Sequence, residues 1–450
     1  MANQAERAGV NPSDNILAEM QAYGSTDPSI NDQAREDLGR LTRLLVSNDL
    51  VAAESEYERF IQVQDRNLEV DASIIRSAIE GRRILVTGGT GCIGKVLLSQ
   101  LLTLNPAQVV SLESSAPPSD TSDVEYASID LRNGDALRAK LSVVKPDVIF
   151  HLAAQRNIAT AQESSLPTLT TNISGTHNLI EAAEQVEAAH IVYASSDKAL
   201  PPLVDGTYAV SKKAGEWLMS EVASRGRMIC TAARLTHVVD NSVIFDHLHK
   251  WATTDATIRL FNPDISMNIQ SATEAAQLIL GSCLEGEPGY LKVQTLGNVD
   301  RPINLLRLAL GTIARFNSSS PIHFRDARNK KLPQLGVFQP SVKAPLIGEF
   351  EIQKARPASF CDNVASLPAN MRAGHELENV VKWLSENGHN DVSQNKVSAV
   401  ESSLSWNMFE AILQGLDKET LDLALYQAKS LPRSNESARI ASTIQTIVNE

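Results

Sequence analysis

Residues 84–94, ILVTGGTGCIG, join a short apolar run to a glycine-rich turn. The apolar run is typical of a buried parallel strand, and the residues after the turn place apolar side chains on one face of a helix. The turn carries Gly88, Gly91 and Gly94. We expect Gly88 to permit a tight turn, Gly91 to admit a pyrophosphate, and Gly94 to let the helix pack closely on the strand. The stretch therefore predicts a dinucleotide-binding turn, with the phosphates facing the helix N-terminus.

Outward from this turn, apolar runs alternate with helical stretches. Three further runs that we expect to be strands lie at 109–112, 148–152 and 191–194. Alternation of this kind predicts a parallel sheet covered by helices on both faces, which is the doubly wound α/β class of the Rossmann type.

Four parts are expected along the chain. They are a helical N-terminal extension (1–80), an NAD(P)-binding Rossmann domain (81–240), a smaller substrate-binding part interleaved with that domain (241–375), and a helical C-terminal extension (376–450). Within the first part, apolar residues at helical spacing predict separate helices at 34–46, 50–63 and 71–80.

The composition excludes several classes of partner. The chain has 450 residues and a formal net charge of −12, from 41 basic and 53 acidic side chains. An acidic surface disfavours nucleic acid and anionic membranes, so we expect neither as a partner. The first residues lack the basic and apolar regions of a signal peptide, and no run of about 18 apolar residues predicts a membrane span. The four cysteines match no zinc-site spacing, so we expect a cytoplasmic protein with reduced thiols and no metal site.

Two acidic residues are candidates to contact the adenosine half of the cofactor. Glu113 ends the second apolar run, where a carboxylate bonds the ribose hydroxyl and repels a 2′-phosphate. No arginine stands in the three positions after it, so we favour NAD over NADP. The alternative for Glu113 is a solvated loop residue. Asp130 follows a further apolar stretch and could either bond the adenine amino group or cap a helix.

Tyr208 and Lys212 lie four residues apart, which places them one turn apart on a helix. A free tyrosine has a pKa near about 10 and is a poor base at neutral pH. A lysine ammonium one turn away, together with the charge of an oxidised nicotinamide, favours the phenolate. We therefore expect Tyr208 to take a proton from a substrate hydroxyl while hydride leaves the same carbon.

Further motifs follow the glycine turn in a fixed order. They are His151-Leu152-Ala153-Ala154, Thr171-Asn172, Ser195-Ser196-Asp197-Lys198-Ala199, and then Tyr208 with Lys212. This order resembles the extended short-chain dehydrogenase/reductase family. The stretches 150–199 and 271–278 are similar to its polysaccharide-biosynthesis branch, the relatives of UDP-N-acetylglucosamine 4,6-dehydratases. The resemblance covers roughly residues 81–315.

The resemblance implies a reaction and a role for each residue of the motifs. Such enzymes oxidise the C4 hydroxyl of a nucleotide-linked sugar with bound NAD(P)+, eliminate water across C5 and C6, and return the hydride to C6. On this pattern Tyr208 is the oxidation base, Lys212 is its activator and a ribose ligand, and Ser196 bonds the C4 oxygen. Asp197 and Lys198 supply the acid and the base of the elimination. Relatives also imply a homo-oligomer.

The cofactor half of the site follows from the same motifs. Asn172 would position the active-site strand or a bound water, and His151 would shape the end of a strand. The residues predicted to contact the cofactor are Gly88, Thr90, Gly91, Cys92, Ile93, Gly94, Glu113, Asp130, Leu131, Ala153, Ala154, Asn172, Tyr208 and Lys212.

The nucleotide-sugar half departs from the family pattern. Arg156-Asn157 stand where the family has Lys-His, and Met267 stands where an arginine is usual. The loop between Lys198 and Tyr208 is about two residues longer than usual. We therefore expect an unusual sugar nucleotide, or a sugar that is not attached to UDP. The residues predicted to bind it are Arg156, Arg234, His237, Asn241 and Arg259, with Arg301 as a further candidate for a phosphate.

Two other functions remain open. A sugar 4-epimerase or a simple NAD-dependent oxidoreductase would use the same cofactor and the same Tyr–Lys pair, and a dehydratase could also epimerise C5. A non-catalytic scaffold would bind the cofactor without turnover. The complete set of Tyr208, Lys212 and Ser196 argues against a scaffold, because a protein without turnover has no need of all three.

Overall fold

The structure is a computed structural model. It describes residues 12–24, 31–68, 72–115, 123–156, 165–284, 286–296, 302–325, 363–366, 375–388 and 392–449. The chain divides into two compact units, of which one comprises residues 1–66, 236–272 and 299–330, and the other comprises 67–235, 273–298 and 331–450. The four-part division expected from the sequence stays a prediction.

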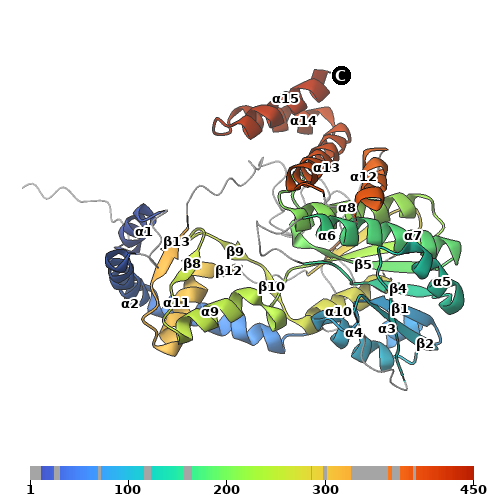
Figure 1. Cartoon of the computed structure of the whole chain (residues 1–450), viewed down its shortest axis with the longest axis horizontal. Helices are drawn as coiled ribbons and strands as arrows, with labels where there is room; N and C mark the ends of the chain where they lie inside the picture. The colour runs from blue at the N-terminus through green and yellow to red at the C-terminus, as the bar shows by residue number, and fades with distance from the viewer. Residues whose placement is uncertain are drawn as a thin grey trace, which may run out of the picture. The chain divides into compact units, whose positions relative to one another are not determined.

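The second unit is built on an eight-stranded sheet (Figure 1). The order across the sheet is β14-β11-β6-β5-β4-β1-β2-β3. The seven strands from β11 to β3 are parallel, and β14 is antiparallel to β11. The strands are β1 (Arg83–Thr87), β2 (Gln108–Glu113), β3 (Glu125–Ser128), β4 (Val148–His151), β5 (His190–Ser196), β6 (Ile229–Leu235), β11 (Lys292–Thr295) and β14 (Asn363–Ser366). The predicted doubly wound parallel sheet is confirmed.

The central strands form because both of their faces are covered by helices. Every residue of β4 and β5 is buried, and Leu85, Ile149 and Ile191 are inaccessible to solvent in one apolar core. Figure 1 shows α7 and α8 on one face of the sheet and α3 and α4 on the other. The helices of this unit before β6 are α3 (Ala72–Ile79), α4 (Cys92–Leu102), α5 (Gly134–Val144), α6 (Leu166–Leu169), α7 (Gly175–Gln185) and α8 (Thr207–Ser224). A parallel sheet buried in this way exposes functional groups at the carboxyl ends of its strands.

The first unit contains the N-terminal helices and several short strand pairs. The long helix α2 (Asp32–Gln62) packs on α11 (Leu305–Phe316), and they approach so closely that a methyl group on Gly311 would overlap α2 at Ala53. Its other elements are α1 (Pro12–Ala22), β7 (His237–Val238), α9 (Val243–Thr253), β8 (Ile258–Leu260), β9 (Ser266–Met267), β10 (Ile269–Gln270), β12 (Ile303–Asn304) and β13 (Ile322–Phe324). The helices predicted at 34–46 and 50–63 form one helix, whose non-helical backbone at Asp49 marks the expected break.

The C-terminal extension is helical, as the sequence predicted. It contains α12 (His375–Asn387), α13 (Gln394–Gln414), α14 (Lys418–Lys429) and α15 (Asn435–Asn449), while α10 (Ala272–Gly281) precedes β11 in the chain. Over the ranges given above, no helix combines the length and the apolar character needed to cross a membrane.

Candidate active site

The glycine turn has the geometry of a phosphate cradle. Gly88 has φ +76°, and a Cβ there would stand 3.0 Å from the backbone of Ala153, so the turn requires glycine. Gly91 is the N-cap of α4 and offers no side-chain cap to the first turn of that helix. Backbone amides at such a helix start face outward and bind phosphate. These residues therefore fit the pyrophosphate of a dinucleotide.

Gly94 has no room for a methyl group. A Cβ there would overlap the Gly88 carbonyl oxygen and lie 2.6 Å from the Gly89 Cα, both of which are backbone atoms. Gly94→Ala should therefore lower the free energy of unfolding by about 1–3 kcal/mol and weaken NAD binding, measured by chemical denaturation and calorimetric titration. Gly134→Ala is the matched control, because its Cβ would meet the movable end of Arg138 at 3.1 Å and the Asn178 side chain at an ordinary contact distance of 3.4 Å. Equal behaviour of the two variants would contradict the packing argument.

Glu113 is buried and bonded to the glycine turn. Its Oε1 accepts hydrogen bonds from the Thr90 amide (3.1 Å) and from Ser111 Oγ (2.6 Å), and its Oε2 accepts from Thr90 Oγ1 (2.6 Å). The side chain is 5% exposed, so the alternative of a solvated loop residue does not describe it. A carboxylate fixed beside the turn is where a ribose hydroxyl would be expected, and its charge would repel a 2′-phosphate.

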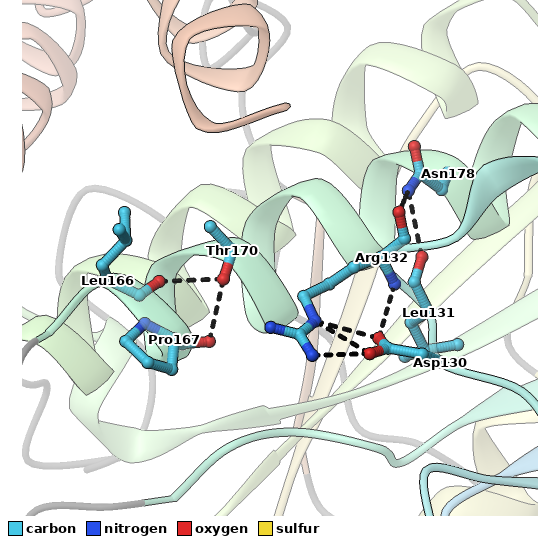
Figure 2. Close-up of polar contacts among 7 residues, drawn as sticks. All are labelled: Asp130, Leu131, Arg132, Leu166, Pro167, Thr170 and Asn178. Carbon is cyan, nitrogen blue, oxygen red and sulfur yellow. Dashed lines mark hydrogen bonds and ion pairs between the residues drawn. The ribbon is translucent and has the colours of Figure 1, made fainter. Parts of the chain in front are cut away.

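Asp130 forms a fork with Arg132, which Figure 2 shows. Arg132 Nε lies 3.0 Å from both carboxylate oxygens, and the Arg132 amide donates to Oδ1 at 2.9 Å. The Asn178 amide group donates to the carbonyl oxygens of Leu131 and Arg132 and so fixes the same turn. A cavity of about 530 Å³ opens beside this turn, between α5, α7 and α12. None of the predicted catalytic side chains lines this cavity.

A buried chain of hydrogen bonds sets the end of β4. The Thr176 hydroxyl donates to the carbonyl of Asn172 (2.7 Å), so it accepts from His151 Nε2 (2.8 Å). His151 Nδ1 then accepts from Thr87 Oγ1 (2.8 Å), which itself accepts from the Ala153 amide (3.1 Å). Burial, with the charge of Lys212, lowers the pKa of His151 to about 3. The ring is therefore neutral at pH 7, and its hydrogen bonds favour the predicted role of shaping the strand end.

Asn172 ties the loop after β4 to the helix that carries Tyr208. It lies in the π-helical turn η2 (Thr170–Ser174), a feature that is often found at functional sites. Its amide oxygen accepts from the Gln155 amide (2.7 Å), and its amide nitrogen donates to the Gln155 carbonyl and to Ser211 Oγ, both at 3.0 Å. Ser211 in turn donates to the carbonyl of Tyr208 (2.8 Å). This placement favours a positioning role.

The end of β5 carries the predicted acid, base and hydroxyl side by side. Ser196 is the last residue of the strand, and η3 (Asp197–Ala199) follows it directly. Ser196 Oγ donates to Asp197 Oδ1 (3.1 Å) and accepts from the Lys198 amide (3.2 Å). Asp197 Oδ2 and Lys198 Nζ form an ion pair at 3.8 Å. The Lys198 side chain is 58% exposed and the Asp197 side chain 15%, so the base is open to solvent while the acid is largely covered.

Tyr208 and Lys212 occupy the first two turns of α8, where Lys212 is buried and Tyr208 is partly buried. Lys212 Nζ donates to the Ala194 carbonyl of β5 (2.7 Å) and lies 5.9 Å from the centre of the Tyr208 ring. Burial raises the pKa of Tyr208 to about 12, with Asp197 raising it further and Arg156 and a Ser196 hydrogen bond lowering it. Burial also lowers the pKa of Lys212 to about 7. Desolvation thus opposes the phenolate that the spacing alone predicts.

A buried ion pair, which the sequence did not reveal, joins α8, the helix of Tyr208 and Lys212, to strand β6. Arg234 Nε and one terminal nitrogen donate to the two oxygens of Glu216, each at 2.9 Å, and Ser195 Oγ donates to the same carboxylate (2.6 Å). Arg234 is 1% exposed, which favours a positioning role over the phosphate binding that we expected. Glu216 stands four residues after Lys212, and this helical spacing is the signal that could have identified it.

The remaining substrate candidates stay predictions. Arg156 belongs to the same unit as Tyr208, and its charge acts on Tyr208. His237, Asn241 and Arg259 belong to the other unit, where His237 Nε2 hydrogen-bonds Ser242 Oγ at 2.7 Å. Arg301 lies outside the described residues.

A Rossmann-type sheet with this glycine turn defines a dinucleotide-binding protein. Residues 84–242 match the model of the NAD dependent epimerase/dehydratase family. This match confirms, over these residues, the resemblance to the extended short-chain dehydrogenase/reductase family that the order of the motifs predicted.

Three curated relatives illustrate the similarity. An uncharacterized membrane protein of Methanocaldococcus jannaschii is 28% identical over 235 residues, which are 50% of this chain and 70% of that protein. A probable polysaccharide biosynthesis protein of Bacillus subtilis is 22% identical over 58% of this chain and 45% of its own length. The CDP-glucose 4,6-dehydratase of Salmonella typhimurium is 34% identical over 128 residues, which are 26% of this chain and 35% of that enzyme.

One solved structure supports the fold. The X-ray structure of Pen from Bacillus thuringiensis superposes with a TM-score of 0.53 at 20% identity, covering 72% of this chain and 97% of that one. This likeness concerns the arrangement of the backbone.

Proposed function

We propose that this chain is an NAD-dependent dehydratase of a sugar nucleotide, working by oxidation at C4 and loss of water across C5 and C6. The observation that carries the proposal is the grouping of Ser196, Asp197 and Lys198 with the pair Tyr208 and Lys212. A protein that only transferred hydride would have no use for an acid and a base beside Ser196.

Each side chain has a task in this scheme. When bound, the nicotinamide cofactor supplies a reversible hydride acceptor. Tyr208 takes the proton of the C4 hydroxyl, whose oxygen Ser196 holds by a hydrogen bond. Since burial raises the pKa of Tyr208 to about 12, positive charge near the ring must offset desolvation. The charge of Arg156 acts in this direction, and Lys212 Nζ lies 5.9 Å from the centre of the ring. A cationic nicotinamide ring would add to them.

The elimination requires Asp197 and Lys198 both to be neutral instead of charged. Asp197 must hold the proton that leaves with the C6 hydroxyl as water, and Lys198 must be neutral to remove the C5 proton. Their ion pair at 3.8 Å places both groups within reach of one proton transfer, directly or through a water. The proton that Lys198 took from C5 returns to C5 when C6 is reduced, and the proton that Tyr208 took from the C4 hydroxyl replaces the one that Asp197 lost with the water, so that each group regains its starting charge.

The mass of the product tests this proposal. We expect the purified chain, incubated with UDP-, dTDP-, GDP- and CDP-linked sugars, to convert one of them to a product lighter by one water. Asp197→Asn should abolish the loss of water, while Asp135→Asn, an exposed aspartate on α5, should leave it unchanged. A product of unchanged mass with inverted C4 would make the chain an epimerase, and bound cofactor without any turnover would make it a scaffold.

A further inference from the structure

The C-terminal helix α13 packs against the segment that leads into Tyr208. It lies outside the residues that match the family model. Leu404 and Met408 share the core of the Rossmann sheet with Val204, whereas Trp406 and Phe409 form a second cluster with Leu203 and the terminal helices. Two neighbouring residues of the loop before α8 are therefore held in two different apolar clusters, and α13 contributes to both.

Two hydrogen bonds join the same helix to the same segment. Thr207 Oγ1, on the first residue of α8, donates to Glu401 Oε2 at 2.7 Å. Ser405 Oγ, 4% exposed, donates to the Val204 carbonyl at 2.6 Å. Glu401 and Ser405 are four residues apart, so they lie on one face of α13 and reach the loop together. The residue before Thr207 is Gly206, which has φ +88° and gives α8 no side-chain cap.

Both bonds are made in partly or fully desolvated surroundings. Burial, together with the charge of Asp205, raises the pKa of Glu401, and the hydrogen bond from Thr207 counteracts this rise. Covering a carboxylate costs free energy unless hydrogen bonds compensate, so the Thr207 hydroxyl satisfies a group that would otherwise favour water. The other end of the loop is held by α8 itself, where Lys213 Nζ donates to the carbonyls of Ala199 and Pro201.

We propose that α13 is a clasp that positions Tyr208, acting through the bonds of Glu401 to Thr207 and of Ser405 to Val204. The proposal rests on the function proposed above, in which the Tyr208 hydroxyl must meet the C4 hydroxyl within hydrogen-bond distance. Thr207 precedes Tyr208 in the chain, so loss of the Thr207 bond would loosen the first turn of α8 and displace the Tyr208 hydroxyl. Misplacement by about 1 Å can cost about 100-fold in rate.

Paired substitutions at both ends of one bond test the clasp. Thr207→Val and Glu401→Leu remove the bond, and Thr207→Ser and Glu401→Gln keep a donor or an acceptor. In Thr207→Val and Glu401→Leu we expect kcat to fall about tenfold, with KM and the cofactor Kd changed by less than about twofold. In Thr207→Ser and Glu401→Gln we expect kcat to stay close to the wild-type value. Ser402→Ala, an exposed position on the same helix, is the control. Ser405→Ala tests the second bond should a variant at 207 or 401 fail to fold.

Amide hydrogen exchange tests the role of α13 independently of the proposed function. Faster exchange of the amides of residues 203–210 in Thr207→Val and Glu401→Leu, but not in Ser402→Ala, is the expected result whatever the substrate. Unchanged exchange, or a kcat within about twofold of the wild type, overturns the clasp. A wild-type chain that acts on no sugar nucleotide overturns the proposed function, while the exchange data still decide the role of α13.

Discussion

Replacing Tyr208 by phenylalanine should lower kcat by about 10²–10⁴-fold and leave NAD binding nearly intact. The phenyl ring keeps the packing of the Tyr208 ring and removes only its hydroxyl, which is the group proposed to take the C4 proton. With a pKa of about 12 the hydroxyl is neutral at pH 7, so its removal leaves no unpaired buried charge. Single-turnover measurement of cofactor reduction isolates this step from product release.

A tyrosine far from the site provides the control for this substitution. Tyr426 lies on α14 with 73% of its surface exposed, and Tyr426→Phe should leave turnover and NAD affinity unchanged. Activity retained in Tyr208→Phe would remove Tyr208 from the mechanism. A loss of NAD binding equal to the loss of turnover would instead assign Tyr208 to cofactor binding.

The fold was predictable from the sequence because its strands are buried on both faces. A run such as Ile84-Leu85-Val86 is continuous rather than alternating, which distinguishes a parallel strand from a half-exposed one. The two helices expected around Asp49 proved to be one helix, because a local break in periodicity does not say whether the chain turns or only kinks. The edge strand β14 was not predicted, since it lies in a stretch without clear periodicity.

The candidate site was predictable where its residues are close in sequence. The glycine turn, the Ser196 motif and the Tyr208 spacing are local patterns with a chemical meaning. Burial is not local, so the spacing of Tyr208 and Lys212 could not reveal that desolvation moves both pKa values against the phenolate. The contacts of Thr207 with Glu401 connect residues 194 positions apart, and no spacing rule finds such a pair.

The buried pair of Arg234 and Glu216 provides the largest expected change in stability. Arg234→Met should lower the free energy of unfolding by about 3–5 kcal/mol, because it leaves the Glu216 carboxylate buried with Ser195 as its remaining bonded partner among the contacts described above. The double variant Arg234→Met with Glu216→Leu should recover most of this loss, since two apolar side chains can replace a buried ion pair. Urea denaturation measures both.

A surface pair of the same chemistry provides the control. Arg225 pairs with Glu184 at 3.0 Å but is 46% exposed, so Arg225→Met should cost about 0–1 kcal/mol. If Arg234→Met costs no more than Arg225→Met, the buried pair does not stabilise the strand end that carries Ser196.

The pH dependence of stability gives an independent check on the same pair. Burial raises the pKa of Glu216, but the charge and hydrogen bonds of Arg234 outweigh burial, so the pKa lies below its ordinary value. A carboxylate with a lowered pKa stabilises the fold above its unfolded pKa of about 4.3, and this contribution is lost as the pH falls through the folded value. The unfolding free energy of the wild type should therefore fall on acidification below about pH 4, more steeply than that of the double variant, which has no carboxylate at position 216 to protonate. Parallel curves would mean that the charge of Glu216 contributes nothing, and that Arg234 acts on the neighbouring active-site strand through packing alone.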